Sequence, residues 1–315
     1  MRTKQPIVFK GIAATVASLV LTACGGGGGG GASTGTASLS LTDAPVDGAK
    51  EVVVWFDGAE FQPAGGNRTM VYVSDTTGTC EVVGVHDPAN PCEVNLMDYT
   101  GTDRVTLLDN VTLPAGQYSW IRLILNGNPG YITLLNDSQF GLRVPSGDET
   151  GLKLHGGFFV AAGSHMDYTI DFDLRKSVHD PIGQPEYILR PTLRLMDDSQ
   201  VGSLSGNVHP TFFEGGDCSG AVYVFDAATP DVPDDEDGEG SGPDPITTTL
   251  VPDDGTHAYE VGFLTDGDYL VAFTCDAIAD DPAVDDGAET VGFLSEAIVT
   301  ITAGETTPYD FLPEP

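Results

Sequence analysis

Carboxylates gathered in two segments of the second half of the chain are the side chains whose chemistry is easiest to specify. The segments span residues 231–244 and 276–286, and each is rich in Asp and contains no Lys or Arg. Calcium takes six to eight oxygen ligands at about 2.4 Å, and carboxylates supply such oxygens. The candidate calcium ligands are Asp234, Asp235, Asp237, Asp280, Asp281, Asp285 and Asp286.

The order of residues in the first segment does not fit an EF-hand. With Gly238 in the glycine position of such a loop, the first ligand would be Pro233, and the twelfth would be Asp244 in place of Glu. Both segments therefore admit two interpretations, a calcium site of another type or acidic loops that stay solvated. The sequence requires no cofactor, and calcium is the one cation that it suggests.

Three further acids, Asp43, Asp171 and Asp173, lie before the two acidic segments. In the stretch Asp171-Phe-Asp-Leu174, strand alternation places Phe172 and Leu174 on one face and the two acids on the other. The pattern predicts Arg–Asp pairs that fix a sheet edge, and the alternative is a carboxylate-binding or metal site built from the three acids. The cations available for such pairs are Arg175, Arg190 and Arg194.

Residue patterns for catalysis are weak throughout the chain. The histidines lack the spacing of metal ligands, and neither Ser146-Gly nor Ser219-Gly occurs in a Gly-x-Ser-x-Gly nucleophile elbow. Acid pairs abound, but the density of Asp makes such pairs expected by chance. We therefore expect no enzymatic activity, and an uncharacterised enzyme is the remaining alternative. The histidines are His86, His155, His165, His179, His209 and His257.

The first 24 residues have the organisation of a secretion signal. Three basic residues precede an apolar stretch, Gly11 to Leu21, which is shorter than the about 20 residues of a membrane-spanning helix. The stretch Leu21-Thr-Ala-Cys24 resembles the lipobox of bacterial lipoproteins, and the resemblance implies that Cys24 is diacylated and becomes the mature N-terminus. Gly25 follows Cys24, and by resemblance to Gram-negative sorting rules this favours the outer membrane. Both the periplasmic face and the cell surface stay open.

The residues after Cys24 predict a flexible tether. Seven glycines, Gly25 to Gly31, are followed by Ala-Ser-Thr-Gly-Thr, and glycine has maximal backbone freedom and no side chain to bury. A Gly-rich chain of this length spans roughly 20 Å. We therefore expect the lipid to hold the first domain close to the membrane.

Four cysteines remain once Cys24 is assigned to the lipid. An oxidising compartment favours their pairing, and four cysteines allow three connectivities. The pairing of Cys80 with Cys92 and of Cys218 with Cys275 keeps each bridge within one predicted domain. A zinc site is not expected, since the sequence has neither C-x-x-C spacing nor a nearby pair of histidines.

The net charge restricts the class of partner. The formal charge is −34, and loss of the three basic residues of the signal takes it to about −37. No Lys or Arg follows Arg194, although acids continue to Glu314. The chain offers no basic groove for a phosphate backbone, so nucleic acid is excluded as a partner. The acidity fits either solubility in a salty habitat or the binding of divalent cations.

Short alternating apolar runs, bounded by Gly, Pro, Asn and Asp, predict an all-β protein of two tandem β-sandwiches. In the first half the runs are 37–42, 51–57, 69–74, 117–125, 152–154, 168–174 and 187–195, and 105–109 fits a short helix or a strand. In the second half they are 202–208, 220–226, 259–264, 266–274 and 297–305.

Motifs in both halves carry family resemblances. Leu41-Thr-Asp-Ala-Pro-Val-Asp47, Asp171-Phe-Asp-Leu-Arg-Lys-Ser177 and Tyr187-Ile-Leu-Arg-Pro-Thr-Leu-Arg-Leu195 resemble the motifs of the domain of unknown function 4382 family over about residues 37–196. That resemblance implies a β-sandwich in a bacterial surface or periplasmic lipoprotein, and no established reaction. The pattern around Val222-Tyr-Val224 and Gly267-Asp-Tyr269 is similar to transthyretin-like, carboxypeptidase-regulatory-type β-sandwiches.

The expected organisation is a signal peptide (1–23), a lipidated cysteine and tether (24–36), a first sandwich (37–198) and an acidic second sandwich (201–315). We expect an outer-membrane lipoprotein, held to the membrane through Cys24, that acts as a binding, adhesion or envelope-assembly module with a protein or glycan partner. The main alternative is a lipoprotein that captures a glycan or a small ligand.

Overall fold

The computed structural model describes residues 33–44, 46, 48–76, 78, 80–82, 91–145, 151–180, 183, 185–216, 218–228, 233–235, 243–281 and 290–313. Residues Ser33–Pro315 form one compact unit. Lipidation of Cys24 and the signal and tether that surround it lie outside the described residues, apart from the last four residues of the tether.

Strands of the first sandwich alternate with short helical turns and occupy the chain up to Asp197. The strands are β1 (Thr34–Ala44), β2 (Ala49–Pro63), β3 (Thr69–Tyr72), β4 (Glu81–Val82), β5 (Cys92–Asn95), β6 (Val105–Pro114), β7 (Gly116–Leu134), β8 (Gln139–Arg143), β9 (Leu152–Val160), β10 (His165–Asp173), β11 (Val178–His179), β12 (Glu186–Leu189) and β13 (Thr192–Asp197). The helical turns are η1 (Val73–Asp75), η2 (Leu96–Asp98) and α2 (Leu174–Ser177).

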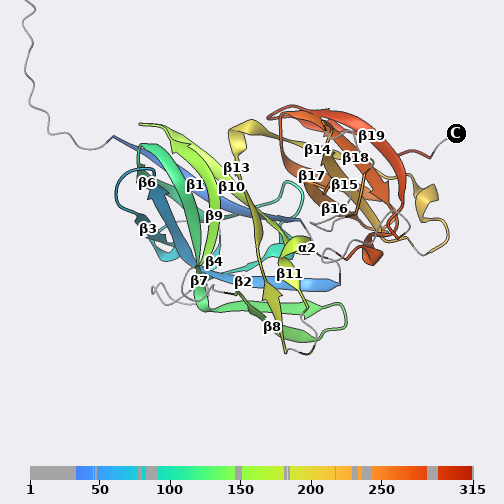
Figure 1. The fold of residues 1–315 in the computed structure, drawn as a ribbon, viewed down its shortest axis with the longest axis horizontal. Coiled ribbons are helices and arrows are strands. Elements are labelled where there is room, and N and C mark those ends of the chain that lie inside the picture. Colours follow the sequence, from blue (N-terminus) through green and yellow to red (C-terminus); the bar gives the residue numbers. More distant parts are fainter. Residues whose placement is uncertain are drawn as a thin grey trace, which may run out of the picture. The chain divides into compact units, whose positions relative to one another are not determined.

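Two sheets face each other in this sandwich (Figure 1). One has the order β13-β10-β1-β6, and the other has the order β11-β12-β8-β7-β2-β5-β4, with β3 added on β2 and β9 added on β7. The first strand, β1, is central, and it runs parallel to β10 from Thr36 opposite His165 to Ala44 opposite Asp173. The core lies between the sheets, where Phe56 of one sheet meets Phe172 of the other edge to face.

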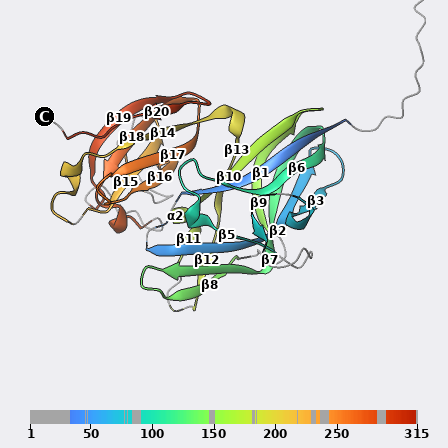
Figure 2. The same cartoon turned by 180° about the vertical axis from the view of Figure 1, so that it is seen from behind.

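Strand β7 is long enough for its two halves to pair with different strands of the larger sheet. Its first half pairs with β9 and with the second half of β2, whereas its second half pairs with β8 and with the first half of β2. Figure 2 shows β2, β7 and β8 alongside one another from behind. Alternate residues of the first half, such as Ile121 and Leu123, are buried in the core, so Trp120 and Arg122 lie on the outer face.

The second sandwich uses the chain from Val201 onward. Its elements are β14 (Val201–Asn207), β15 (Gly220–Asp226), β16 (Thr247–Val251), β17 (Ala258–Thr265), β18 (Gly267–Thr274), β19 (Phe293–Ile301) and β20 (Thr306–Pro308), with the turns η3 (Asp198–Gln200), η4 (Pro210–Phe213) and η5 (Ala277–Ala279). A three-stranded sheet, β17-β14-β20, faces a four-stranded sheet, β16-β15-β18-β19.

The predicted all-β fold of two sandwiches is confirmed, and three local expectations are refined. Residues 105–109 belong to a strand, β6, and not to a helix. The run 187–195 is two strands, β12 and β13, which join different sheets, and Pro191, which lacks an N–H group for a ladder, lies between them. The run 168–174 ends at Asp173, where α2 begins.

Every sheet is composed wholly of strands from one side of the link at residues 198–200. The two predicted domain ranges, 37–198 and 201–315, stay predictions, since contacts merge residues 33–315 into one unit. Among the residues that the structure describes, no helix is both long and apolar enough to cross a membrane.

Candidate functional site

The short helix α2 begins where β10 ends, and Asp173 caps it. The Asp173 carboxylate accepts a hydrogen bond from the backbone N–H of Lys176 at 3.2 Å, as expected of an N-cap aspartate. Burial raises the pKa of Asp173 above its usual value, although Lys176 opposes that shift. In this turn the side chain of Arg175 reaches the second sandwich.

Arg175 is 3% exposed and donates four hydrogen bonds to the second sandwich. Its Nη1 donates to the Tyr223 hydroxyl at 2.8 Å and to Oδ2 of Asp280 at 3.1 Å. Its Nη2 donates to the carbonyl oxygens of Ala277 at 2.8 Å and of Asp280 at 3.4 Å. The Tyr223 hydroxyl in turn donates to Oδ2 of Asp280. We call Arg175, Tyr223 and Asp280 the Arg175 cluster.

Electrostatics keep the Arg175 cluster in one protonation state. Burial raises the pKa of Tyr223 far above its usual value, and the neighbouring carboxylate of Asp280 adds to the rise while Arg175 opposes it. The phenol therefore stays neutral and donates its proton to Asp280. Arg175 and Asp280 compensate each other's charge, which a buried charge requires.

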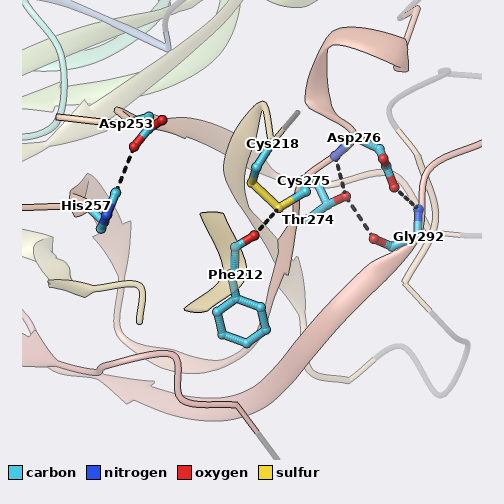
Figure 3. The surroundings of a disulfide bond; sticks show 8 residues. All are labelled: Phe212, Cys218, Asp253, His257, Thr274, Cys275, Asp276 and Gly292. Carbon is cyan, nitrogen blue, oxygen red and sulfur yellow. Dashed lines mark hydrogen bonds and ion pairs between the residues drawn. A yellow bond between two sulfur atoms is a disulfide. The ribbon is translucent and has the colours of Figure 1, made fainter. Parts of the chain in front are cut away.

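A disulfide bond holds the segment that supplies Asp280 (Figure 3). Cys218, just before β15, is bonded to Cys275, just after β18, with a Cα–Cα distance of 4.5 Å. The adjacent Asp276 accepts a hydrogen bond from the N–H of Gly292 at 3.2 Å, and its own N–H donates to Thr274 at 3.0 Å. This anchored corner leads directly into η5 and then to Asp280. The other bridge joins Cys80 to Cys92.

Arg194 and Asp171 form the kind of pair that the sequence predicts. The Arg194 guanidinium donates to Oδ2 of Asp171 through Nε at 3.0 Å and through Nη2, between adjacent strands β13 and β10. The pair lines a cavity of about 20 Å³ together with Asp43 and Glu260, which is room for about one water molecule. Arg175 bonds to Asp280 rather than to a neighbouring acid, and Arg190 is exposed.

The seven candidate calcium ligands have different surroundings. Asp237, Asp285 and Asp286 lie outside the described residues. Asp235 and Asp280 are buried, Asp234 is half-buried and Asp281 is exposed. Within the described part of the chain, no group of three or more His, Cys, Asp and Glu side chains could hold a metal ion. Calcium binding stays a prediction, and Asp280 has a structural role in the Arg175 cluster.

No local pattern pointed to Tyr223 as a site residue or to the contact between Arg175 and Asp280. Two features of the sequence bear on this contact. Arg175 is one of few cations in an acidic chain. The strand Gly220–Asp226 is apolar at every position but the last, as expected of a strand that is buried on both faces. Such a strand requires another element to pack against its second face, and here Arg175 of α2 contacts Tyr223 of that strand.

Comparison with known proteins places the first sandwich in a family. The sequence matches the family described as "Domain of unknown function (DUF4382)" over residues 34–191, which is half of the chain. The chain belongs to the DUF4382 family. No curated protein matches it. The residues matched by the family include α2, so Arg175 is part of the DUF4382 region, whereas its partners Tyr223 and Asp280 are not.

Solved structures similar to the DUF4382 chain are remote. The Bacillus anthracis TIE protein is 9% identical, with a TM-score of 0.21; the match covers 89% of this chain and 34% of that one, so this chain spans about a third of that protein. A minor pilin of Streptococcus agalactiae is 10% identical, with a TM-score of 0.20 and coverage of 88% and 97%. A putative cell adhesion protein of Bacteroides fragilis is 8% identical, with a TM-score of 0.22 and coverage of 87% and 92%. Similarity at this level carries no argument about function.

Proposed function

We propose that this DUF4382 protein is a non-enzymatic lipoprotein of a Gram-negative outer membrane that serves as a binding, adhesion or envelope-assembly module. The Arg175 cluster carries the proposal. Four hydrogen bonds from one buried guanidinium fix the second sandwich to α2, so the two sandwiches present their loops in a constant arrangement. Loops that a rigid scaffold positions are the usual place for binding residues.

Sequence supports the membrane attachment in this proposal. The lipobox-like stretch Leu21-Thr-Ala-Cys24 would attach lipid to the sulfur of Cys24, and the glycines that follow would separate the lipid from the sandwiches. The protein would then face either the periplasm or the outside of the cell. A protein or glycan would be its partner.

Fractionation of cells tests the attachment. Wild-type protein should stay with the outer membrane after a high-salt wash, and Cys24→Ser should appear in the soluble fraction because its side chain cannot be acylated. Cys24→Ser that remains with the membrane would contradict the lipoprotein proposal. Digestion of intact cells with protease then distinguishes the two faces, since only a surface-exposed chain is cleaved.

Capture of a partner tests the binding role. The chain from Cys24 onward, produced without its signal and therefore not acylated, can be coupled to a support through the Cys24 thiol, since the other four cysteines form disulfides. Incubation with envelope extract and with a glycan array should give a retained protein or glycan, with less retained by Arg175→Met. Turnover of a substrate by the purified chain would contradict the non-enzymatic role.

A groove favours the second candidate function, capture of a glycan or small ligand. Its volume is about 610 Å³, within the range of small-molecule sites. Polar groups from Thr100, Asp103, Asn207 and Glu260 contribute to its lining. Isothermal titration calorimetry against soluble glycans, with Glu260→Gln as the variant, tests this role. If Glu260→Gln binds a glycan as tightly as the wild type, the groove is not the binding site.

A further inference from the structure

One face of the larger sheet in the first sandwich collects positive charge in a chain of net charge −34. The face consists of the outward side chains of β3 and of Arg68 just before it, and those of the second half of β2, the first half of β7, and β9. We call it the Trp120 face. Its cations are Arg68, Arg122 and Lys153.

Strand register places the key side chains of the Trp120 face next to one another. Arg122 of β7 is opposite both Glu60 of β2 and Lys153 of β9, and Trp120 is opposite His155. The guanidinium carbon of Arg122 lies 5.0 Å from the Trp120 ring centroid, and Nζ of Lys153 lies 4.6 Å from it. Two cations therefore sit against one indole ring, an arrangement that aromatic rings favour.

Acidic residues are scarce on the Trp120 face. Residues 58–63, 69–72, 116–125 and 152–160 contain one acid, Glu60, and its side chain is 8% exposed. Glu60 is already paired with Arg68 at 3.0 Å and with Arg122 at 3.2 Å. Two arginines and a lysine against one buried carboxylate leave this face positive, while the rest of the chain carries the acidity.

Apolar and aromatic side chains surround the cations. Met70 is 44% exposed, Tyr72 is 39% exposed and Phe159 is 53% exposed. Met70 is opposite Glu60 in the register of β3 with β2, and Tyr72 is opposite Gly58, so both lie on the face. Cations mixed with Trp, Tyr and exposed apolar side chains are the composition of a surface that rests on lipid headgroups.

The tether meets the first sandwich beside this face. The carbonyl oxygen of Ser33 accepts a hydrogen bond from the N–H of Ala115 at 2.7 Å, and Ala115 immediately precedes β7. Trp120 follows four residues after Gly116, or about 13 Å along the strand. Ser33 is nine positions after Cys24, so a lipid on Cys24 can lie no more than about 30 Å from Ser33.

We propose that the Trp120 face docks on anionic phospholipid headgroups of the membrane that anchors Cys24. The inference deepens the proposed attachment and rests on it for the distance to the membrane. Headgroup phosphates would accept hydrogen bonds from Lys153, Arg68 and Arg122. The second sandwich, which has no Lys or Arg, is repelled by the same surface and is directed away from it. The protein is thereby oriented as well as anchored.

Vesicle binding tests the docking without the lipid anchor. The probe is the mature chain with Cys24→Ser, sedimented with vesicles of phosphatidylcholine alone or mixed with phosphatidylglycerol. Each Lys or Arg near an anionic surface contributes about fivefold in affinity, so Arg68→Gln with Lys153→Gln should bind phosphatidylglycerol vesicles roughly 25-fold more weakly. Arg143→Gln with Arg190→Gln is the matched control, because it removes two exposed cations from elsewhere and should bind like the parent chain.

Fluorescence locates the contact. The chain has two tryptophans, and Trp55→Phe leaves Trp120 as the reporter, whose emission should shift to the blue with phosphatidylglycerol vesicles. Equal binding to both kinds of vesicle, or an equal loss in the Arg143 and Arg190 control, would overturn the docking. Binding to heparin without binding to the anionic vesicles would also overturn it and assign the face to a polyanionic glycan. Cell fractionation of Cys24→Ser is read independently, so failure of the anchor and failure of the docking are distinct results.

Discussion

At the scale of single residues, the Arg175–Asp280 pair is the contact whose loss has the largest expected cost. Both side chains are at most 2% exposed. Removing one member of a buried pair leaves the other charge uncompensated in a medium that solvates it poorly, which costs about 3–5 kcal/mol. Arg175→Met should therefore lower the free energy of unfolding by that amount in urea titrations of the mature chain.

Two controls separate charge from shape in that experiment. Arg175→Met combined with Asp280→Leu removes both charges and should recover much of the lost stability. Lys176→Met alters a neighbouring cation whose side chain is 19% exposed and contacts the carbonyl of Pro245 at 3.0 Å and Asp173 at 3.7 Å, so it should cost less. If Arg175→Met and Lys176→Met lower the free energy of unfolding equally, the buried Arg175–Asp280 pair does not have the larger stabilising role expected of it.

Tyr223 makes the stability of the protein sensitive to alkali. Burial raises the pKa of this phenol in the folded state, so above about pH 10 the unfolded chain loses a proton that the folded chain keeps. The unfolded state then binds fewer protons, and the free energy of unfolding falls as pH rises. Tyr223→Phe should make this fall shallower by about 1.4 kcal/mol per pH unit.

Urea titrations between pH 9 and pH 11 measure that slope. This pH range brackets the pKa of an ordinary tyrosine, which is about 10. Tyr72→Phe is the control, because it removes the hydroxyl of an exposed tyrosine. An identical slope in wild type and Tyr223→Phe would mean that Tyr223 does not keep its proton.

At the scale of elements, the Cys218–Cys275 bridge stabilises the corner that presents Asp280. It spans 57 residues, and closure of such a loop in the unfolded chain contributes about 4 kcal/mol in the chain-entropy model. Cys218→Ser with Cys275→Ser should lose stability of that order in urea titrations. Cys80→Ser with Cys92→Ser, across 12 residues, should lose less. Non-reducing peptide maps should contain these two bridges and no peptide that joins the two halves.

Apolar runs and alternation predicted the longer strands. Gly220–Asp226 was predicted with its observed bounds, and β7 and β18 were predicted over most of their apolar residues. Strands such as β8 (Gln139–Arg143) and β20 (Thr306–Pro308) were not predicted, because short segments with few apolar residues depend on neighbours for their conformation.

Prediction of the site failed for a different reason. The Asp171–Arg194 pair could be predicted because both residues lie on adjacent strands with matching motifs. The partnership of Arg175 with Asp280 joins residues 105 positions apart, and local patterns contain no information about such a contact. The acidic density that suggested a calcium ligand at Asp280 also concealed its role as the counter-ion of Arg175.

At the scale of the whole molecule, calcium remains the cation to test. If acids of the two segments hold calcium in the folded state alone, the ion should raise the free energy of unfolding by about 2.7 kcal/mol at a hundredfold excess over Kd. Thermal melts of the mature chain in EDTA and in millimolar calcium should then differ, and Asp235→Asn with Asp281→Asn should abolish the difference. A similar shift with sodium chloride at matched ionic strength would assign the effect to general screening.

The central position of β1 also determines when the first sandwich can be completed. This strand is the first part of the sandwich to leave the ribosome, yet its neighbours are β6 and, 129 residues away at the Thr36–His165 contact, β10. Folding in the order of synthesis is therefore blocked, and the β10-facing edge of β1 stays open until residue 173 has been exported. A nascent or truncated chain that ends before β10 keeps that edge unpaired and prone to aggregate, which makes the late arrival of His165–Asp173 the step that commits the sandwich to fold.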